Sequence, residues 1–246
     1  MPPTWRKLEN ISGEYNANIA GMDEHVKRSP PPRRYNAPRR RAPAGQTRHA
    51  IVAAARRLFV EQGYGGTTMA AVAAAAGVSH ETVYAAFGPK PALFRHLVEI
   101  ALSGTEEPVP ALERDIVRQV RAEPDPRRII ALFAHTVRLL QERVAPLIAV
   151  LSTAAPTDPD LKAFADELSA RRVGHMRAFA AEVAAKGGLR VGMTIEMAAD
   201  VIWVMNSPEF FLLCVRDRGW TADLFEEWLA DAWTRLLLPG NALPER

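Results

Sequence analysis

Residues 67–90 read TTMAAVAAAAGVSHETVYAAFGPK, and this stretch decides the fold. Thr68 is placed to cap a short alanine-rich helix, because a threonine hydroxyl accepts a hydrogen bond from a free backbone N–H of the first turn. Gly77 supplies the positive φ that a tight turn between helices often requires, and Ser79 is placed to cap the next helix. The spacing predicts a helix-turn-helix motif over these residues.

Apolar residues at helical spacing surround the motif on both sides. Upstream, one apolar stripe begins after Thr47 and ends before Gly63. Downstream, Pro91 occupies a first-turn position and opens another helix. Further helices are expected over residues 110–121, 126–143, 145–154, 159–186, 194–216 and 221–238. The sequence shows no alternating strand pattern, so an all-α protein is predicted.

The expected helices divide the chain into two folded domains with a segment at each end. Residues 1–46 are expected to form a disordered arm rich in basic residues and proline, because they have little apolar periodicity. Residues 47–90 form the predicted three-helix DNA-binding domain. Residues 91–240 form a helical bundle for ligand binding and dimerisation, and residues 241–246 form a tail. A length of 246 residues and a hydrophobic content of 48% suffice for a buried core.

Positive charge is concentrated at the N-terminal end of the chain. Residues 1–48 contain ten Lys and Arg against four Asp and Glu, a net charge of +6, whereas the whole chain carries +3. Such asymmetry indicates a polyanionic partner, most commonly nucleic acid, with a membrane surface as the alternative. The cluster Arg39, Arg40 and Arg41 is expected to lie along phosphates or in a minor groove. The alternatives are a solvated tail, or an over-extended start with Met22 as the initiator.

The motif resembles that of the TetR family of bacterial repressors. The resemblance rests on the Thr-Thr start at 67–68, the Ala-Gly-Val-Ser turn at 76–79, the aromatic pair Tyr84 and Phe87, and the Gly-x-Lys step at 88–90. It implies a sequence-specific transcriptional regulator, a repressor that binds a palindromic double-stranded operator as a homodimer and is released by a small, largely apolar effector. An architectural DNA-binding protein with little sequence preference is the alternative.

The resemblance also implies roles for individual residues. It assigns phosphate contacts to Thr68 and Lys90. It assigns the groove-facing surface to Ser79, His80, Glu81, Thr82 and Tyr84. Helix N-termini and hydroxyls favour phosphate oxygens, and a short helix in the major groove offers its first residues to base edges. For Tyr84 the alternative is a core position inside the domain, and for His80 it is an exposed helix position without a base contact.

Two features depart from the family's pattern. Ala85 and Ala86 replace the aromatic or polar pair that many relatives carry, which leaves methyl contact with thymine but less hydrogen bonding. Glu81 repels phosphates, so it is expected either to accept a hydrogen bond from a cytosine amino group or to point aside. The basic arm is therefore expected to supply part of the affinity for DNA.

The last predicted helix carries an apolar stripe wider than one packing face requires. The residues assigned to dimerisation are Leu224, Phe225, Trp228, Leu229, Trp233 and Leu236. Together with the helix at 194–216, they resemble the four-helix dimer interface of the TetR family. Packing wholly within one subunit is the alternative.

Pro208 lies inside the helix predicted over 194–216. A proline has no N–H and strains the preceding turn, so a kink is expected near Val204, with a free carbonyl beside Asn206 and Glu209. Such a kink makes room for a ligand. The expected lining consists of Phe133, His175, Met176, Phe179, Trp203, Asn206, Glu209 and Phe210. The alternative is an ordinary core in which Pro208 is tolerated.

Several other classes of protein fit the sequence poorly. It has no His-x-x-x-His spacing, no phosphate-binding glycine loop and no nucleophile elbow, so no enzyme, metal site or cofactor is expected. It has no apolar run of about 18 residues and no signal-peptide pattern. A cytoplasmic protein without membrane contact is expected. The single cysteine, Cys214, fits a reducing compartment and is expected to be buried, with a reactive sensor thiol as the alternative.

Overall fold

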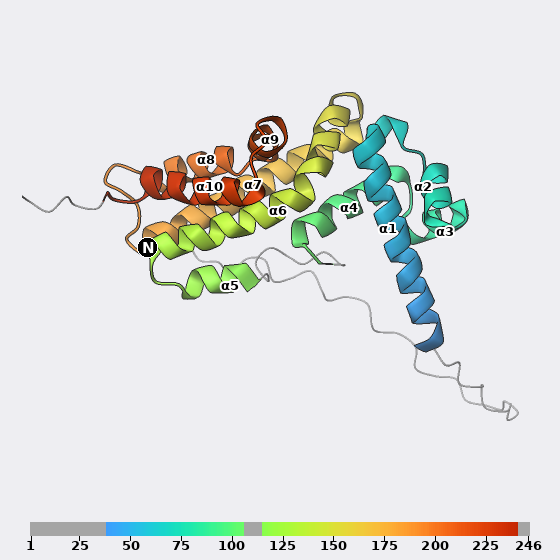
Figure 1. Ribbon diagram of the computed structural model, residues 1–246, viewed down its shortest axis with the longest axis horizontal. Coiled ribbons are helices and arrows are strands. Elements are labelled where there is room, and N and C mark those ends of the chain that lie inside the picture. Colours follow the sequence, from blue (N-terminus) through green and yellow to red (C-terminus); the bar gives the residue numbers. More distant parts are fainter. Residues whose placement is uncertain (1–37, 106–114, 241–246) are drawn as a thin grey trace, which may run out of the picture. The chain divides into compact units, whose positions relative to one another are not determined.

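The structure, a computed structural model, describes residues 38–105 and 115–240 (Figure 1). In these two ranges it consists of helices, turns and loops without a strand, which confirms the predicted all-α class. Residues 1–37, 106–114 and 241–246 lie outside the described residues. The tail and the arm up to residue 37 therefore stay predictions.

The first three helices form the head: α1 spans Pro38–Gly66, α2 Met69–Ala76 and α3 His80–Phe87. The expected start at Thr47 is wrong, because residues 38–46 are helical and do not belong to a disordered arm. Proline suits the first turn of a helix, and the arginines that follow it are good helix formers. Gly63, with φ 72° and ψ 175°, interrupts α1 where glycine was expected to end it.

The turn between α2 and α3 has the geometry that its sequence predicts. The Thr68 hydroxyl accepts a hydrogen bond from the Ala71 N–H at 3.1 Å, and Gly77 ends α2 in the left-handed conformation, with φ 69° and ψ 30°. The Ser79 hydroxyl accepts from the Thr82 N–H at 3.2 Å at the start of α3. Three local signals in the sequence thus fix the two ends of this turn.

Helix α4, Lys90–Ser103, leads from the head into the body. It buries Phe94 against Phe59 of α1, with the two rings edge to face at a centroid distance of 5.0 Å. The same hydrophobic core includes Leu147 of α6 and Phe164 of α7. We call it the first core. Because head and body share this core, α4 is not a free linker between them.

The rest of the chain forms the body. Its elements are α5 Asp115–Ala122, α6 Pro126–Ala154, the 3₁₀ turn η2 Ala155–Thr157, α7 Pro159–Ala185, α8 Ile195–Met205, α9 Pro208–Leu212, the π-helical turn η3 Leu213–Asp217 and α10 Ala222–Leu237. In Figure 1, α6 and α7 run along the body, with α8 and α10 beside them. A second core lies among these helices, around the fully buried Phe225, Leu229 and Trp233 of α10. The helices predicted over 159–186 and 221–238 are confirmed by α7 and α10.

Helix α6 runs unbroken through Pro146, whereas the sequence suggested two helices, 126–143 and 145–154. A proline inside a helix removes one backbone hydrogen bond and strains the preceding turn. Val144 and Leu147, on either side of it, are both buried in the first core. Tertiary packing therefore holds the helix together across a residue that ends isolated helices.

The helix expected over 194–216 is divided at Asn206 and Ser207, so the predicted kink near Val204 is wrong. Ser207 is extended, with φ −70° and ψ 147°, the region favoured before a proline, and Pro208 opens a new helix instead of bending an old one. The segments Ile195–Met205 and Pro208–Asp217 meet at 42°. No single helix in the described ranges is long and apolar enough to cross a membrane, and only this bent pair reaches that length and apolarity when its two segments are taken together.

Gly77→Ala is expected to lower the free energy of unfolding by about 1–2 kcal/mol, because a Cβ disfavours the left-handed conformation. An added Cβ meets no neighbouring atom at Gly77, so the effect is one of backbone conformation alone. Gly65→Ala is the matched control, since Gly65 also has open space around it and does not have a positive φ. Urea denaturation measures both, and equal midpoints for the two variants contradict the assignment.

Candidate DNA-binding face and ligand cavity

Helix α3 turns one face to the first core and the other to solvent. Val83 and Phe87 are buried. The exposed residues are Ser79, His80, Glu81, Thr82, Tyr84, Ala85 and Ala86. Tyr84 keeps 55% of its surface exposed, so the alternative of a core tyrosine is wrong for it. Tyr64 occupies the core instead, stacked on Phe59 at 5.7 Å.

Glu81 is held by its own helix. Hydrogen bonds to the Glu81 N–H and to the Ser79 side chain hold the pKa of the Glu81 carboxyl below its ordinary value. A carboxylate in the first turn also interacts favourably with the helix dipole. Both expectations for Glu81, a contact with a cytosine amino group and a position turned aside, stay predictions. The Ser79 oxygen is likewise engaged in capping α3, at 3.2 Å from the Thr82 N–H.

Lys90 has a role inside the head that the sequence did not predict. Its ammonium donates to the carbonyl of Tyr64 at 2.9 Å and to the carbonyl of Thr67 at 3.1 Å. It also lies 4.2 Å from the centre of the Tyr64 ring, within the range of a cation–π interaction. Lys90 therefore ties the start of α4 to the connection between α1 and α2, and its expected phosphate contact stays a prediction.

Arg48 is a second cation of the head that sequence reasoning missed. Its Nη1 donates to the Ala86 carbonyl at 3.2 Å, and its guanidinium carbon lies 4.3 Å from the centre of the Phe87 ring. Arg48 thus holds α1 against the C-terminal end of α3. The side chains of Arg39, Arg40 and Arg41 lie outside the described part of the structure, so their DNA contact stays a prediction.

The residues expected to mediate dimerisation divide between surface and interior. Leu224, Trp228 and Leu236 are exposed by 46%, 38% and 40%. Phe225, Leu229 and Trp233 are fully buried within the subunit, so they are not available to a partner, and that part of the expectation is wrong. The apolar stripe of α10 is wide because it has two parts: the inner residues pack in the second core, and the outer residues face solvent. On α8, Met197 and Val204 are also exposed, by 51% and 53%, and the sequence had not singled them out.

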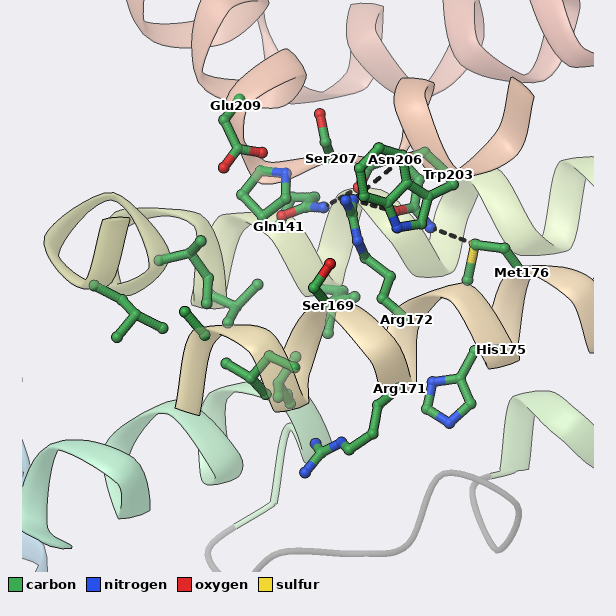
Figure 2. Close-up of a pocket in the computed structure, with 18 of the residues that line it drawn as sticks. Gln141, Ser169, Arg171, Arg172, His175, Met176, Trp203, Asn206, Ser207 and Glu209 are labelled. Atoms are coloured by element: carbon green, nitrogen blue, oxygen red, sulfur yellow. Dashed lines mark hydrogen bonds between the residues drawn. The ribbon is translucent and has the colours of Figure 1, made fainter. Parts of the chain in front are cut away.

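A cavity of about 440 Å³ opens between α4, α6, α7 and the α8–α9 break (Figure 2). Five of the eight expected ligand residues line it: His175, Met176, Trp203, Asn206 and Glu209. The other three, Phe133, Phe179 and Phe210, do not. Phe133 stacks on Phe179 at 3.9 Å and on Trp233 at 5.6 Å, so these rings are core, as the alternative had it. Phe210 packs beside Trp228 at 5.6 Å.

The break between α8 and α9 directs two backbone carbonyls to side chains of the body. The Ser207 N–H donates to the Val204 carbonyl, and the Phe210 N–H donates to the Ser207 hydroxyl. The Trp203 carbonyl accepts from Nη1 of Arg172 at 3.1 Å, and the Asn206 carbonyl accepts from Nε2 of Gln141. The sequence predicted one free carbonyl at this position. The structure has two carbonyls that leave the helical pattern, and side chains of α6 and α7 donate hydrogen bonds to both.

Gln141 and Arg172 are the polar groups of the cavity that sequence reasoning missed. Gln141 is 2% exposed, and its Oε1 has no hydrogen-bond partner among the described residues, nor has Nε1 of Trp203. A buried polar atom without a partner costs about 1–3 kcal/mol. Arg172 is half-buried with its guanidinium 4.2 Å from the centre of the Trp203 ring, and burial lowers its pKa. The residues that Gln141 and Arg172 contact lie 65 and 31 positions away, so no local pattern marks them.

Metal ligands and the single cysteine are further candidate functional groups in the described residues. No group of three or more His, Cys, Asp or Glu there is arranged to hold a metal ion. Cys214 is 7% exposed and packs in the second core, as expected. Burial raises the pKa of its thiol, which keeps the thiol protonated at neutral pH and disfavours a reactive role.

Comparison with known proteins matches the helix-turn-helix region to a family and the described helices to a known fold. Residues 51–97 match the model of the bacterial regulatory proteins of the TetR family. No curated protein matches the sequence. Among solved structures, NalD, the secondary repressor of the MexAB-OprM multidrug efflux pump in Pseudomonas aeruginosa, is similar with a TM-score of 0.61 and 24% identity, over 80% of this chain and 98% of that chain.

Two further structures share the fold. The MbdR regulator from Azoarcus sp. CIB has a TM-score of 0.61 and 20% identity, over 78% of this chain and 100% of that chain. A regulator from Saccharomonospora viridis in complex with choline has a TM-score of 0.60 and 16% identity, over 79% of this chain and 99% of that chain. At such identities the structures establish the fold alone.

A helix-turn-helix head on an all-helical body defines the class of DNA-binding transcription regulators. Residues 51–97 match the model of the TetR family of bacterial regulatory proteins, and head and body together have the fold of solved regulators. The resemblance found in residues 67–90 is therefore confirmed.

Lys90→Ala is expected to lower the free energy of unfolding by about 1–3 kcal/mol, because two carbonyls of the head lose their donor. Tyr84→Phe removes only an exposed hydroxyl and is expected to change stability by less than about 0.5 kcal/mol. Urea denaturation of both variants measures the difference. A Lys90→Ala protein as stable as the unmodified chain contradicts the role inside the head.

Proposed function

We propose that this regulator is a repressor that binds a palindromic operator as a homodimer and leaves it when a small molecule occupies the cavity of the body. The observation that carries the proposal is the exposed face of α3, where His80, Thr82 and Tyr84 stand on a short helix whose opposite side is locked into the first core. Such a helix enters the major groove and offers its first residues to base edges.

A second copy of the chain fits the outer face of α8 and α10. The exposed apolar residues of these helices include Met197, Val204, Leu224 and Trp228. Exposed apolar side chains gathered on neighbouring helices mark an interface more often than a free surface. A two-fold axis through this face pairs the two heads, which a palindrome with half-sites one DNA turn apart requires.

Release by a ligand is supported by the position of α4. Leu102 of α4 lines the cavity, and Glu99 of the same helix pairs with Arg171, another lining residue, at 2.7 Å. A ligand that shifts these contacts acts directly on the helix that carries the head. A coupling of about 1–3 kcal/mol changes DNA affinity roughly 5- to 150-fold, which is enough for induction.

Tyr84→Ala is expected to weaken operator binding by about tenfold or more while leaving stability unchanged, because the residue is exposed and reaches the DNA. A gel-shift titration against the DNA upstream of the gene measures this. The control is random DNA of equal length at about 50 mM and 200 mM salt. Equal affinity for the two DNAs at both salt concentrations favours the architectural alternative and contradicts a sequence-specific repressor.

Trp228→Arg is expected to convert the dimer to a monomer of 27.1 kDa and to abolish operator binding, because a charge on the outer face of α10 opposes burial against a second copy. Val191→Arg is the matched control, since Val191 is fully exposed in the loop before α8. Sedimentation velocity gives the oligomeric state. A Trp228→Arg protein that remains dimeric places the interface elsewhere.

A further inference from the structure

We propose that the cavity between α4, α6, α7 and the α8–α9 break binds a small organic carboxylate with an apolar body, the carboxylate accepting hydrogen bonds from Arg172. This assignment rests on the proposed function, because it takes the cavity to be the effector site. Binding of a carboxylate is nevertheless measurable without DNA, so the two proposals are tested separately.

Arg172 brings a positive charge into the cavity without a salt bridge to any carboxylate in the described ranges. Its guanidinium donates to two neutral acceptors, the carbonyl of Trp203 at 3.1 Å and Oδ1 of Asn206 at 3.4 Å (Figure 2). Glu209 lies on the same cavity, and its charge acts to raise the pKa of Arg172, but the two side chains form no salt bridge. The loss of hydration lowers the pKa of Arg172. A ligand carboxylate replaces that hydration with charge-assisted hydrogen bonds, for which the planar guanidinium is suited.

The neighbouring Arg171 lines the same cavity but has its charge satisfied. It pairs with Glu99 at 2.7 Å and with Glu167 at 3.3 Å. The hydrogen bond to Glu99 is the largest cause of the raised pKa of Arg171. Of two adjacent arginines on α7, one is therefore occupied by carboxylates of the protein, and the other has room for a carboxylate of the ligand.

Gln141 supplies a second polar anchor, for the α8–α9 break. Its Nε2 donates to the Asn206 carbonyl, which fixes the orientation of the amide, and its oxygen points away from Asn206 (Figure 2). That oxygen is buried and has no partner among the described residues. Because this oxygen is closed off from solvent, Gln141 anchors the α8–α9 break beside the cavity and is not itself a ligand contact.

The remaining lining favours an apolar body on the ligand. The aliphatic residues are Leu102, Leu140, Val144, Ile148, Leu151 and Leu168. A volume of about 440 Å³ lies within the usual size of a small-molecule site. A cationic ligand on Glu209 is the rival. It is the weaker choice, because Glu209 is exposed and a hydrated carboxylate gains little from an ion pair.

The test uses isothermal titration of the full chain with 4-phenylbutanoate, octanoate and decanoate, each compared with its amide and its primary amine. Within a set the apolar body is constant and only the charge of the head group changes. At least one carboxylate is expected to bind about tenfold or more tightly than its amide and its amine, because an ionised partner strengthens a hydrogen bond to a half-buried guanidinium.

Two substitutions and a control assign the preference to Arg172. Arg172→Met is expected to lower carboxylate affinity by about tenfold or more and to leave amide affinity unchanged. Arg172→Lys keeps the charge and is expected to keep the preference for carboxylate, so it carries the test if the methionine variant does not fold. Arg177→Met is the control, since Arg177 is an exposed residue of the same helix that pairs with Glu196.

Three results overturn the carboxylate site: no carboxylate binds below about 1 mM, amides or amines bind as tightly as carboxylates, or Arg172→Met keeps the preference. A different result separates it from the proposed function. If a carboxylate binds through Arg172 but leaves operator affinity unchanged in a gel shift, the site stands and the release mechanism fails. If operator binding is absent altogether, the site is still judged by the titration alone.

Discussion

Pro208 lacks a backbone N–H, and the polar interior of the body is arranged around that missing donor. The chain stops α8 at Met205 and begins a new helix at Pro208, where the absent N–H has no consequence. The peptide groups in between no longer pair along one helix. The carbonyl of Trp203, in the last turn of α8, accepts from Arg172 of α7, and the carbonyl of Asn206, in the break, accepts from Gln141 of α6. The break is therefore held by two other helices.

The same junction explains why a cavity with polar anchors occurs in a body that is otherwise apolar. Burial of a guanidinium or an amide in a hydrophobic core costs free energy unless the group forms hydrogen bonds there. The carbonyl of Trp203 accepts such a hydrogen bond from Arg172, and the carbonyl of Asn206 accepts one from Gln141. Arg172 is left beside space that aliphatic residues line, and the oxygen of Gln141 stays buried without a partner among the described residues. The proposed ligand binding therefore depends on polar groups that the protein does not fully satisfy, whereas stability depends on the two hydrophobic cores.

The sequence predicted the head better than the body, and the reason is the range of the interactions involved. Thr68, Gly77 and Ser79 act on residues within one or two turns, so their roles are visible in a short window. Inside the head, Lys90 contacts carbonyls more than twenty residues away, so no short window of sequence predicts these contacts. In α10, an apolar stripe predicts burial but does not distinguish the core from an interface, so Phe225 and Trp228 looked alike although only the first is buried. Pro208 was recognised, yet whether a proline bends a helix or opens a new one depends on Ser207 as a cap.

Arg171 and Arg172 are consecutive, so in an α-helix their side chains leave the axis about 100° apart. One is held by Glu99 of α4 and the other by the chain between α8 and α9. Together they fix the rotation of α7 about its own axis, because turning the helix either way lengthens at least one of the two attachments. In the proposed release mechanism, a ligand at the α8–α9 junction acts on this rotation of α7 and, through the Arg171–Glu99 pair, on α4, the helix that leads into the head.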